Sequence, residues 1–414
     1  MAGAGGYPPA LETALESVDA SPGQAPLLQP PQVPLCQRVP EHTAQLASLL
    51  SWHEQALAAV RAVGDTWARE EGGPSQADLE TELSWLLDDA VAGLITAVGD
   101  ARQVSWRWIE RGLRSKEQEQ QLQQEVQLRA PLQALDDLWQ QRLHLRAPLQ
   151  YLTTSAHWRD LVLSVGPGIL IPRPETEQMV DFVAEAVAGN PALALAPWAD
   201  LGTGSGALAI ALARQLPAVP WVWAVDLSPT PVAYATFNSQ RLGVADRVRV
   251  VQGSWYEPLQ QAGAGRLGGI VSNPPYVTAQ QMPGLQAEVG RHEPHLALDG
   301  GAGLGIDALV PICTGAVTWL QPGGFLALET GGGEQAHYVA DLLRHLRDYQ
   351  QQQQQWQGSS GEGSDTGLGN ENIGVSTSRS SSTGGEDELA FTDVRVRTDF
   401  FGVERFVTAT RSGL

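Results

Sequence analysis

The sequence predicts an α/β fold with a parallel sheet, preceded by a smaller helical region. Short apolar runs alternate with helical patterns from Trp198 onward, and strands that alternate with helices form parallel sheets. A glycine-rich turn, Gly202 to Gly206, follows the first apolar run and suits close approach of a ligand to the backbone. The motif Asn273-Pro274-Pro275-Tyr276 follows the fourth run, at the strand end where open α/β sheets bind ligands.

The composition limits the classes of function. The chain has 414 residues, enough for one large core and a smaller one, and 43% of them are hydrophobic. It contains no apolar run long enough to cross a bilayer, so no membrane association is expected. The formal charge of −20 argues against stable binding of nucleic acid. Cys36 and Cys313 lie far apart without a partner motif, so neither a disulfide nor a metal site is predicted.

Residues 1–40 are expected to form a disordered leader, because they are rich in Pro, Ala, Gly and Gln. Acidic residues within this segment make it a poor transit peptide. Residues 41–148 are expected to form a small all-α domain, since apolar residues recur at helical spacing in Leu46 to Val60, Leu79 to Leu94 and Leu132 to Leu143. This domain can serve packing alone or the recognition of a macromolecular partner, and the sequence leaves both open.

Residues 149–177 are predicted to form a connecting hairpin and linker, with alternating residues around Trp158. The linker ends in Ile171-Pro172-Arg173-Pro174-Glu175-Thr176-Glu177, where two prolines flank an arginine and acidic residues begin a helix. That helix is predicted over Glu177 to Ala188. Residues 178–414 then form the second domain.

The first two strands of the second domain predict a cofactor site. Strand Trp198–Leu201 contains Asp200 and is followed by the glycine-rich turn and a helix, Ala207 to Leu216. The residues of the turn expected to contact the cofactor are Gly202, Thr203, Gly204, Ser205 and Gly206. The second strand, Trp221 to Val225, ends in Asp226, whose carboxylate can accept hydrogen bonds from both ribose hydroxyls of a nucleoside. The alternative is that Asp226 only caps the following helix.

The remaining strands complete the sheet. A third strand, Arg247 to Val251, precedes Trp255, which either lies against an adenine ring or packs in the core. The fourth strand, Leu267 to Val271, leads to Asn273. The other predicted elements are a helix over Leu304–Leu320, a fifth strand over Gly324–Glu329, and closing strands over Phe391–Val396 and Glu404–Thr410. Residues from about 350 to 388 are low in apolar content and are expected to form a disordered insertion at the sheet edge.

The Asn273 motif suits the recognition of a planar NH2 group. Pro274 and Pro275 stop the strand and stiffen the turn. The side-chain oxygen of Asn273 and the carbonyl of Pro274 can each accept a hydrogen bond from the NH2 group, while Tyr276 packs over its face. An ordinary turn is the alternative for Asn-Pro-Pro alone, but the glycine-rich turn upstream makes it the weaker interpretation.

The run Asp200 to Gly206, with Asp226 and the Asn273 motif, resembles class I S-adenosylmethionine-dependent methyltransferases. The run Ile171 to Glu177, with Arg291-His292-Glu293-Pro294 and Glu404-Arg405-Phe406-Val407, resembles the HemK-type family of peptide chain release factor glutamine N5-methyltransferases. Ala156 to Leu161 and Pro283 to Gly290 are similar to the organellar branch of plants and algae. The resemblance covers about Leu79 to Thr410 without the insertion, and the sequence departs from it at Thr154, where relatives commonly have glycine.

The resemblance implies a Rossmann-like, seven-stranded sheet with one antiparallel strand. It implies S-adenosyl-L-methionine as cofactor and, as methyl acceptor, the glutamine of a Gly-Gly-Gln loop in a class I release factor of an organelle, docked with help from the helical domain. Asn273, Pro274 and Tyr276 are then the catalytic residues, and Asn273 also contacts the cofactor. Arg173 and Glu177 are candidates for the methionine pocket. A monomer is expected, in the plastid first and the mitochondrion second.

Two other functions compete with this interpretation. A nucleic-acid adenine-N6 methyltransferase shares the Asn-Pro-Pro-Tyr motif, because an adenine amino group has the same planar geometry as an amide. The charge of −20 and the lack of a recognisable DNA-reading module oppose it. A non-catalytic binding protein that retains the cofactor fold is opposed by the intact Asn273 motif and Asp226.

Overall fold

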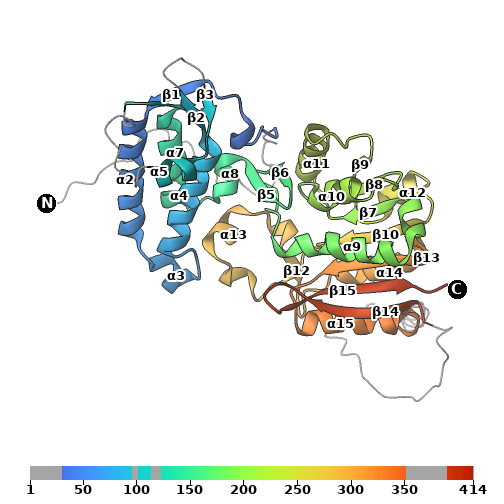
Figure 1. Ribbon diagram of the computed structural model, residues 1–414. Helices are drawn as coiled ribbons and strands as arrows, with labels where there is room; N and C mark the ends of the chain where they lie inside the picture. The colour runs from blue at the N-terminus through green and yellow to red at the C-terminus, as the bar shows by residue number, and fades with distance from the viewer. Residues whose placement is uncertain (1–29, 96–100, 113–122, 351–388, 414) are drawn as a thin grey trace. The chain divides into compact units, whose positions relative to one another are not determined.

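The computed structural model describes residues 30–95, 101–112, 123–350 and 389–413. The described residues from Pro31 onward belong to one compact unit. Within these ranges, no helix combines the length and the apolar character needed to span a bilayer. Figure 1 shows the elements in sequence order, coloured from blue at the start of the chain to red at its end.

The first part of the chain forms a helical domain around its own core. Its elements are η1 (Leu35–Gln37), β1 (His42–Gln45), α2 (Leu46–Val63), α3 (Thr66–Glu71), α4 (Gln76–Ala90), β2 (Val91–Ile95), β3 (Ala101–Gln103), α5 (Trp106–Gly112), β4 (Glu125–Leu128) and α7 (Leu132–Leu145). Helix α4 begins with a capping box, in which Ser75 and Asp78 exchange side-chain and backbone hydrogen bonds. The leucines at helical spacing on α2, α4 and α7 are buried against one another, which confirms the predicted helices.

The prediction that this domain is all-α is wrong. A four-stranded sheet with the order β1-β4-β2-β3 lies beside the helices. Val91 and Leu94, whose spacing predicted a longer helix, belong to strand β2 instead. Strand β2 pairs with β3 and β4, so partners distant in sequence override a local pattern that suits either structure.

The expected boundary of the leader at residue 40 is also wrong. Leu35, the first residue of η1, is fully buried in the core of the helical domain. The ordered domain therefore includes residues from about Leu35, which is held by the core of the helical domain and by a hydrogen bond from Arg38 to Thr154. The rest of the predicted leader, residues 1–29, lies outside the described residues.

The connection between the domains contains the predicted hairpin. Helix α8 (Leu149–Thr153) precedes it, and strands β5 (Ser155–Trp158) and β6 (Leu161–Ser164) pair in antiparallel fashion. Thr154, which stands where relatives commonly have glycine, adopts a left-handed backbone with φ of 53°. That conformation favours glycine, so Thr154 adopts it with strain, and nothing in the structure explains the threonine.

The second domain is built on the predicted seven-stranded sheet. Its strands are β7 (Trp198–Leu201), β8 (Val222–Asp226), β9 (Val248–Gln252), β10 (Leu267–Ser272), β13 (Leu320–Glu329), β14 (Phe391–Thr398) and β15 (Glu404–Arg411). Their order is β14-β15-β13-β10-β7-β8-β9. Among these strands, β15 runs in the direction opposite to the other six. The first strand, β7, lies beside the fourth, β10, so the strand order reverses between them.

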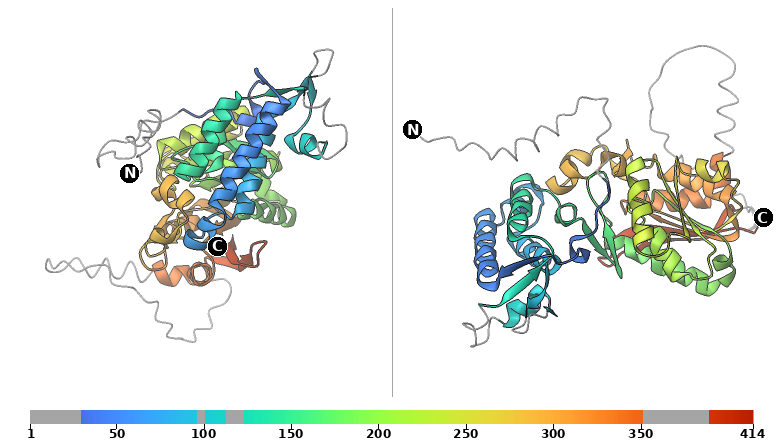
Figure 2. Two further views of the ribbon diagram at one scale, coloured as in Figure 1. Left: turned by 90° about the vertical axis from the view of Figure 1, so that its left-hand side faces the viewer. Right: turned by 90° about the horizontal axis from the view of Figure 1, so that it is seen from above.

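Helices cover both faces of this sheet (Figures 1 and 2). The core on one face contains side chains of α9 (Gln178–Gly189), α10 (Ala207–Gln215) and α11 (Pro229–Arg241). The core on the other face contains side chains of α12 (Glu257–Gln261), α14 (Leu309–Trp319) and α15 (Glu334–Arg344). Successive strand residues point to opposite faces, so Trp198 belongs to the first core and Ala199 to the second.

The remaining short elements lie in connections. They are η2 (Glu175–Glu177), η3 (Pro191–Leu195), β11 (Val277–Thr278), η4 (Met282–Gly284), α13 (Ala287–His292), η5 (His295–Ala297) and β12 (Asp299–Gly301). The helix predicted over Leu304–Leu320 begins later, at Leu309, because Gly303 and Gly305 have positive φ angles that a helix cannot continue through. The predicted insertion lies outside the described residues, which stop at Gln350 and resume at Leu389, just before the edge strand β14.

Candidate active site

The predicted site residues gather at one edge of the sheet. Asp200 is next to last in β7, Asp226 ends β8, and Asn273 directly follows β10. These strands are parallel neighbours, so their carboxyl ends meet at the point where the strand order reverses. Ser272 Oγ donates a hydrogen bond to Leu201 O (2.5 Å) and ties the ends of β7 and β10 together.

The glycine-rich turn connects β7 to α10. Gly202, Gly204 and Gly206 all have positive φ angles of 56° to 87°, which other residues adopt with strain. The backbone N–H groups of Gly202 and Thr203 both donate to Val225 O at 2.9 Å, so the turn is fixed to β8. A Cβ atom added at Gly204 would meet no heavy atom within 4 Å. The turn therefore presents open space beside its backbone, as a cofactor pocket requires.

Asp200 is buried beneath this turn and has one oxygen to spare. Its Oδ2 accepts hydrogen bonds from Thr203 Oγ1 (2.6 Å) and Ala209 N (3.1 Å). Its Oδ1 has no hydrogen-bond partner among the described residues. Burial raises the pKa of this carboxyl to about 7. A buried acceptor without a donor fits a cationic group, such as the ammonium of a methionine moiety.

Asp226 has both structural contacts and free acceptor capacity. Its Oδ2 accepts from Gly204 N and its Oδ1 from Ser228 N, both at 3.0 Å. Each carboxylate oxygen has a second acceptor position, which leaves room for two ribose hydroxyls. Helix α11 begins after Ser228, whose own side chain makes no capping hydrogen bond, so the contact of Asp226 Oδ1 with Ser228 N also supports the start of this helix. Burial raises the pKa of Asp226, while its backbone hydrogen bonds lower it.

The ring of Trp255 lies close to the glycine-rich turn. A Cβ atom added at Gly202 would lie 3.7 Å from Trp255 Cζ3. Trp255 has a positive φ of 41°, an unusual conformation for a bulky residue that is found most often at functional sites. It also packs against the core on the α14 side of the sheet. The position therefore fits an adenine contact, and packing explains part of the burial of the ring.

The Asn273 motif is held rigidly on the sheet edge. The carbonyl oxygen of Tyr276 accepts a hydrogen bond from Gln335 Nε2 (3.0 Å), a buried side chain at the start of α15. A Cβ atom added at Gly300 would lie 2.7 Å from Tyr276 Cα, so only glycine allows the two segments to approach. Among the described residues, neither Asn273 Oδ1 nor Pro274 O has a hydrogen-bond partner. The two acceptors that the proposed recognition needs are therefore unpaired.

Two residues that the sequence did not assign to the site lie behind this motif. Asn273 Nδ2 donates to Thr176 Oγ1 (3.1 Å), and Thr176 Oγ1 donates to Glu329 Oε2 (2.5 Å). The hydroxyl of Tyr276 donates to Glu329 Oε1 (3.1 Å). Glu329 is 1% exposed. It ends the apolar strand β13 next to β10, and a carboxylate in that place was the signal available in the sequence.

The family-specific runs contact one another around the site. Glu293 Oε1 pairs with Arg173 (2.6 Å) and its Oε2 accepts from Ile171 N (3.1 Å). The carboxylate of Glu177 accepts from Arg159 N (2.9 Å). Arg173 and Glu177 are thus engaged in contacts that shape the linker, and their place in a methionine pocket stays a prediction.

One further cluster of polar groups lies away from this site. Cys36, Asp89 and His157 form the group of potential metal ligands found within the described ranges, with ligand atoms within 4.8 Å of one another. His157 Nε2 lies 3.0 Å from Asp89 Oδ1, and this hydrogen bond raises the pKa of His157 to about 10. No sequence pattern indicates the cluster, because its members come from three separate segments.

The fold and the site together define a class I S-adenosylmethionine-dependent methyltransferase. The family model described as the methyltransferase small domain matches residues 180–305. The chain is 44% identical over 205 residues to a release factor glutamine methyltransferase of Thermosynechococcus vestitus, covering 50% of this chain and 69% of the relative. Proteins of the same description from Gloeobacter violaceus and a Synechocystis species are 43% identical over 220 residues and 42% over 227. Those matches cover 53% and 55% of this chain, and 74% and 75% of the relatives.

The chain belongs to the release factor glutamine methyltransferase family. The similarity spans more than two thirds of each of these relatives at over 40% identity. This membership confirms the family that the motifs predicted from the sequence, and with it the enzyme class and S-adenosylmethionine as cofactor.

Proposed function

We propose that the protein transfers a methyl group from S-adenosylmethionine to the side-chain amide nitrogen of the glutamine in the Gly-Gly-Gln loop of a release factor. The observation that carries this proposal is the pair of open acceptors, Asn273 Oδ1 and Pro274 O, on a rigid turn beside the cofactor turn. Two acceptors on one edge match the two hydrogens of an amide NH2 group. Family membership supports the same substrate.

The residues at the sheet edge fit the cofactor. The unpaired Oδ1 of Asp200 suits the ammonium of its methionine end, and the carboxylate of Asp226 suits the ribose hydroxyls. The open space at Gly204 allows the cofactor to pass close to the backbone of the turn, and Trp255 can lie against adenine. When bound, S-adenosylmethionine supplies an electrophilic methyl group on a sulfonium, so the transfer needs no further activation of the methyl donor.

The acceptor amide is the harder partner to activate. Its nitrogen lone pair is delocalised into the carbonyl, and the amide is too weak an acid to lose a proton easily near neutral pH. Hydrogen bonds from its NH2 group to Asn273 Oδ1 and Pro274 O favour the charge that develops on nitrogen during attack. They also fix the direction of that nitrogen, while Tyr276 covers the amide face. The proton can leave after the transfer, to water or to a carbonyl oxygen.

The partner is proposed to be an organellar class I release factor, with the plastid as the compartment before the mitochondrion. The resemblance of Ala156 to Leu161 and of Pro283 to Gly290 to the organellar branch of plants and algae supports this assignment. A cavity of about 650 Å³ supports a docking role for both domains, because its lining includes Glu70 and Glu71 of the helical domain and Met282, Leu285 and Arg291 of the second domain. A monomer is proposed, which light scattering can check.

Incubation with labelled cofactor tests the proposed function. The purified protein is offered plastid and mitochondrial release factors, each also with Gln→Asn in the Gly-Gly-Gln loop, and the methyl group is located by mass spectrometry. Label is expected on the glutamine of the plastid factor and on neither variant. Label on RNA or DNA, with none on either factor, would replace this proposal by the adenine methyltransferase.

A further inference from the structure

The carboxylate of Glu329 lies behind the Asn273 motif and connects two of its residues, Asn273 and Tyr276. One of its oxygens accepts from the hydroxyl of Tyr276 and the other from the hydroxyl of Thr176. Thr176 in turn contacts the side-chain amide of Asn273 at 3.1 Å. Glu329 and Thr176 are 1% and 5% exposed, so water cannot readily replace either partner.

The direction of the hydrogen bonds fixes the orientation of the Asn273 amide. An ionised carboxylate can only accept, so the single hydroxyl proton of Thr176 must point at Glu329. The oxygen of Thr176 can then only accept from Asn273, which requires the NH2 end of the amide at that contact. The other end, Oδ1, is thereby turned away from Thr176 and left open. The orientation thus follows from the chemistry of the network, independently of how oxygen and nitrogen are assigned.

We propose that Glu329 is a positioning residue for methyl transfer, which acts through Thr176 to keep Asn273 Oδ1 directed at the acceptor amide and through the Tyr276 hydroxyl to hold the covering ring. This inference rests on the proposed function, since it describes how the same site is prepared. The opposite amide orientation would present the NH2 of Asn273 to the NH2 of the substrate, where two donors face each other.

The protonation state of Glu329 controls this network. A protonated carboxyl can donate to Thr176, which frees the hydroxyl of Thr176 to donate to Asn273 Oδ1 and removes the preference for one amide orientation. Burial raises the pKa of Glu329 to about 7, against the hydrogen bonds of Thr176 and Tyr276 and the nearby charge of Arg405, which lower it. Glu175 is the other charged group acting on this carboxyl, and it raises the pKa. The oriented state is therefore the one above about pH 7.

Four variants of the full chain test the proposal. Thr176→Val keeps the shape but removes the hydroxyl, whereas Thr176→Ser keeps the hydroxyl. Glu329→Gln keeps an acceptor for Thr176 but does not titrate. Thr408→Val makes the same change as Thr176→Val at a buried threonine of β15 and serves as the matched control. The readouts are the single-turnover rate with saturating cofactor, the cofactor Kd by calorimetry, and the thermal midpoint.

The rate of Thr176→Val is expected to fall at least about tenfold with an unchanged cofactor Kd, since a hydrogen-bond network to a charged group is lost. The rates of Thr176→Ser and Thr408→Val should stay within about threefold of the wild-type rate, because neither variant loses this hydrogen-bond network. The wild-type rate should rise with pH through about 7, and Glu329→Gln should lack this rise. A Thr176→Val rate equal to that of wild type, equal losses in Thr176→Ser and Thr176→Val, or a pH rise that persists in Glu329→Gln would each overturn the proposal.

A second readout does not depend on the substrate. In protein labelled with ¹⁵N at asparagine, the side-chain amide signal of Asn273, assigned by its loss in Asn273→Ala, is expected to shift with pH through about 7 in wild type only. The same signal in Glu329→Gln should stay constant, and an equal shift in both proteins would reject the proposal. If the wild-type enzyme methylated no release factor, the proposed function would fail, while this signal would still decide the role of Glu329.

Discussion

Asp226 combines two backbone contacts with its proposed role at the ribose. Replacing it by alanine removes the acceptor for both hydroxyls and the anchor of Gly204 N. Hydrogen bonds to an ionised group contribute about 1.5–3 kcal/mol each, so the cofactor Kd should rise at least about tenfold in Asp226→Ala. Calorimetry measures this, with the exposed Asp246→Ala as a control on the same domain. Equal affinities in wild type and Asp226→Ala would limit Asp226 to a structural part.

The raised pKa of Asp200 predicts a pH dependence of cofactor binding. Its carboxyl, with a pKa of about 7 in the free protein, must lose its proton to pair with the cationic end of the cofactor. Affinity should therefore be constant above about pH 8 and fall by up to about tenfold per pH unit below about 7. Calorimetry over a range of about three pH units around neutrality measures the change of cofactor affinity with pH.

In Asp200→Asn the slope should be absent or reduced to what Asp226 contributes, since burial also raises the pKa of Asp226. Affinity that does not change with pH in the wild-type protein would show that Asp200 does not meet the cation.

Asn273 should contribute mainly to aligning the acceptor nitrogen, and its contact with the cofactor should add little to cofactor affinity. Asn273→Ala is expected to leave the cofactor Kd nearly unchanged and to lower turnover by about 10²–10³, the usual effect of losing one preorganised contact at a reacting centre. Asn273→Asp keeps an acceptor oxygen, so it should retain partial activity, although its charge near the sulfonium stabilises the ground state. Turnover with a release factor and separate calorimetry distinguish the two effects. Wild-type turnover in Asn273→Ala would reject this account of the motif.

At the scale of elements, the segment between α15 and β14 offers a direct test of the predicted insertion. Both flanking elements belong to the core of the second domain, with Val339 and Phe391 fully buried in it. Deleting residues 351–388 and joining the ends by a short Gly-Ser loop should therefore leave stability and turnover close to wild type. The segment has too little apolar content to join a core, and the cost of closing a loop depends weakly on its length.

Thermal unfolding and turnover of the deleted protein check this expectation. A scrambled insertion of the same length and composition is the control for the effect of length alone. A drop in the thermal midpoint of more than about 5 °C, which corresponds to about 2 kcal/mol for a domain of roughly 200 residues, would show that the segment contributes to the fold.

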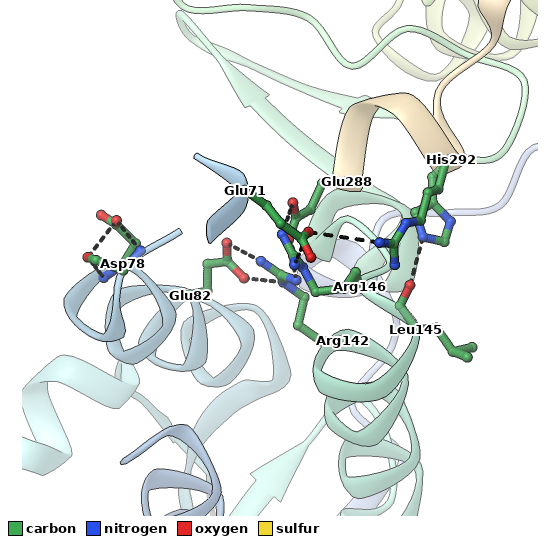
Figure 3. A network of polar contacts seen from close by, with 10 residues as sticks. Glu71, Asp78, Glu82, Arg142, Leu145, Arg146, Glu288 and His292 are labelled. Carbon is green, nitrogen blue, oxygen red and sulfur yellow. Dashed lines mark hydrogen bonds and ion pairs between the residues drawn. The ribbon is translucent and has the colours of Figure 1, made fainter. Parts of the chain in front are cut away.

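At the scale of the whole molecule, a buried charge network connects the helical domain to α13 of the second domain (Figure 3). Arg142 on α7 is 1% exposed and pairs with Glu288 (3.0 Å) and with Glu82 of α4 (2.5 Å). Arg146 also pairs with Glu288 (2.7 Å) and lies over the ring of Trp67. His292 Nε2 lies 2.9 Å from Leu145 O at the end of α7. The segment that follows the Asn273 motif is thus anchored to the helical domain.

Glu288→Gln should destabilise the protein strongly. It leaves two buried guanidinium groups with less negative charge, and breaking a buried ion pair by removing one partner costs about 3–5 kcal/mol. Urea unfolding measures the free energy of unfolding, and Asp341→Asn, which breaks an exposed pair with Arg344, should cost less than about 1 kcal/mol. Equal effects of the two substitutions would mean that the network does not hold the domains together.

The sequence alone determined the parts of the protein that depend on local pattern and motif spacing. Alternating strands and helices, the glycine-rich turn and the Asn273 motif predicted the sheet, the edge where the site lies and the family. Local periodicity succeeds there because a strand buried on both faces and a helix with one apolar face carry their patterns in adjacent residues.

Features that depend on contacts between distant residues could be recognised only in the folded protein. The spacing of apolar residues in β2 predicts a helix, but pairing with β4, a strand from another part of the chain, makes this segment a strand. The contacts of Glu329 with Thr176 and of Glu288 with Arg142 join residues 153 and 146 positions apart. Ionisable groups acquire such roles from burial and from the partners that the fold brings within hydrogen-bond distance. Neither the burial nor the partners can be predicted from the adjacent residues in the sequence.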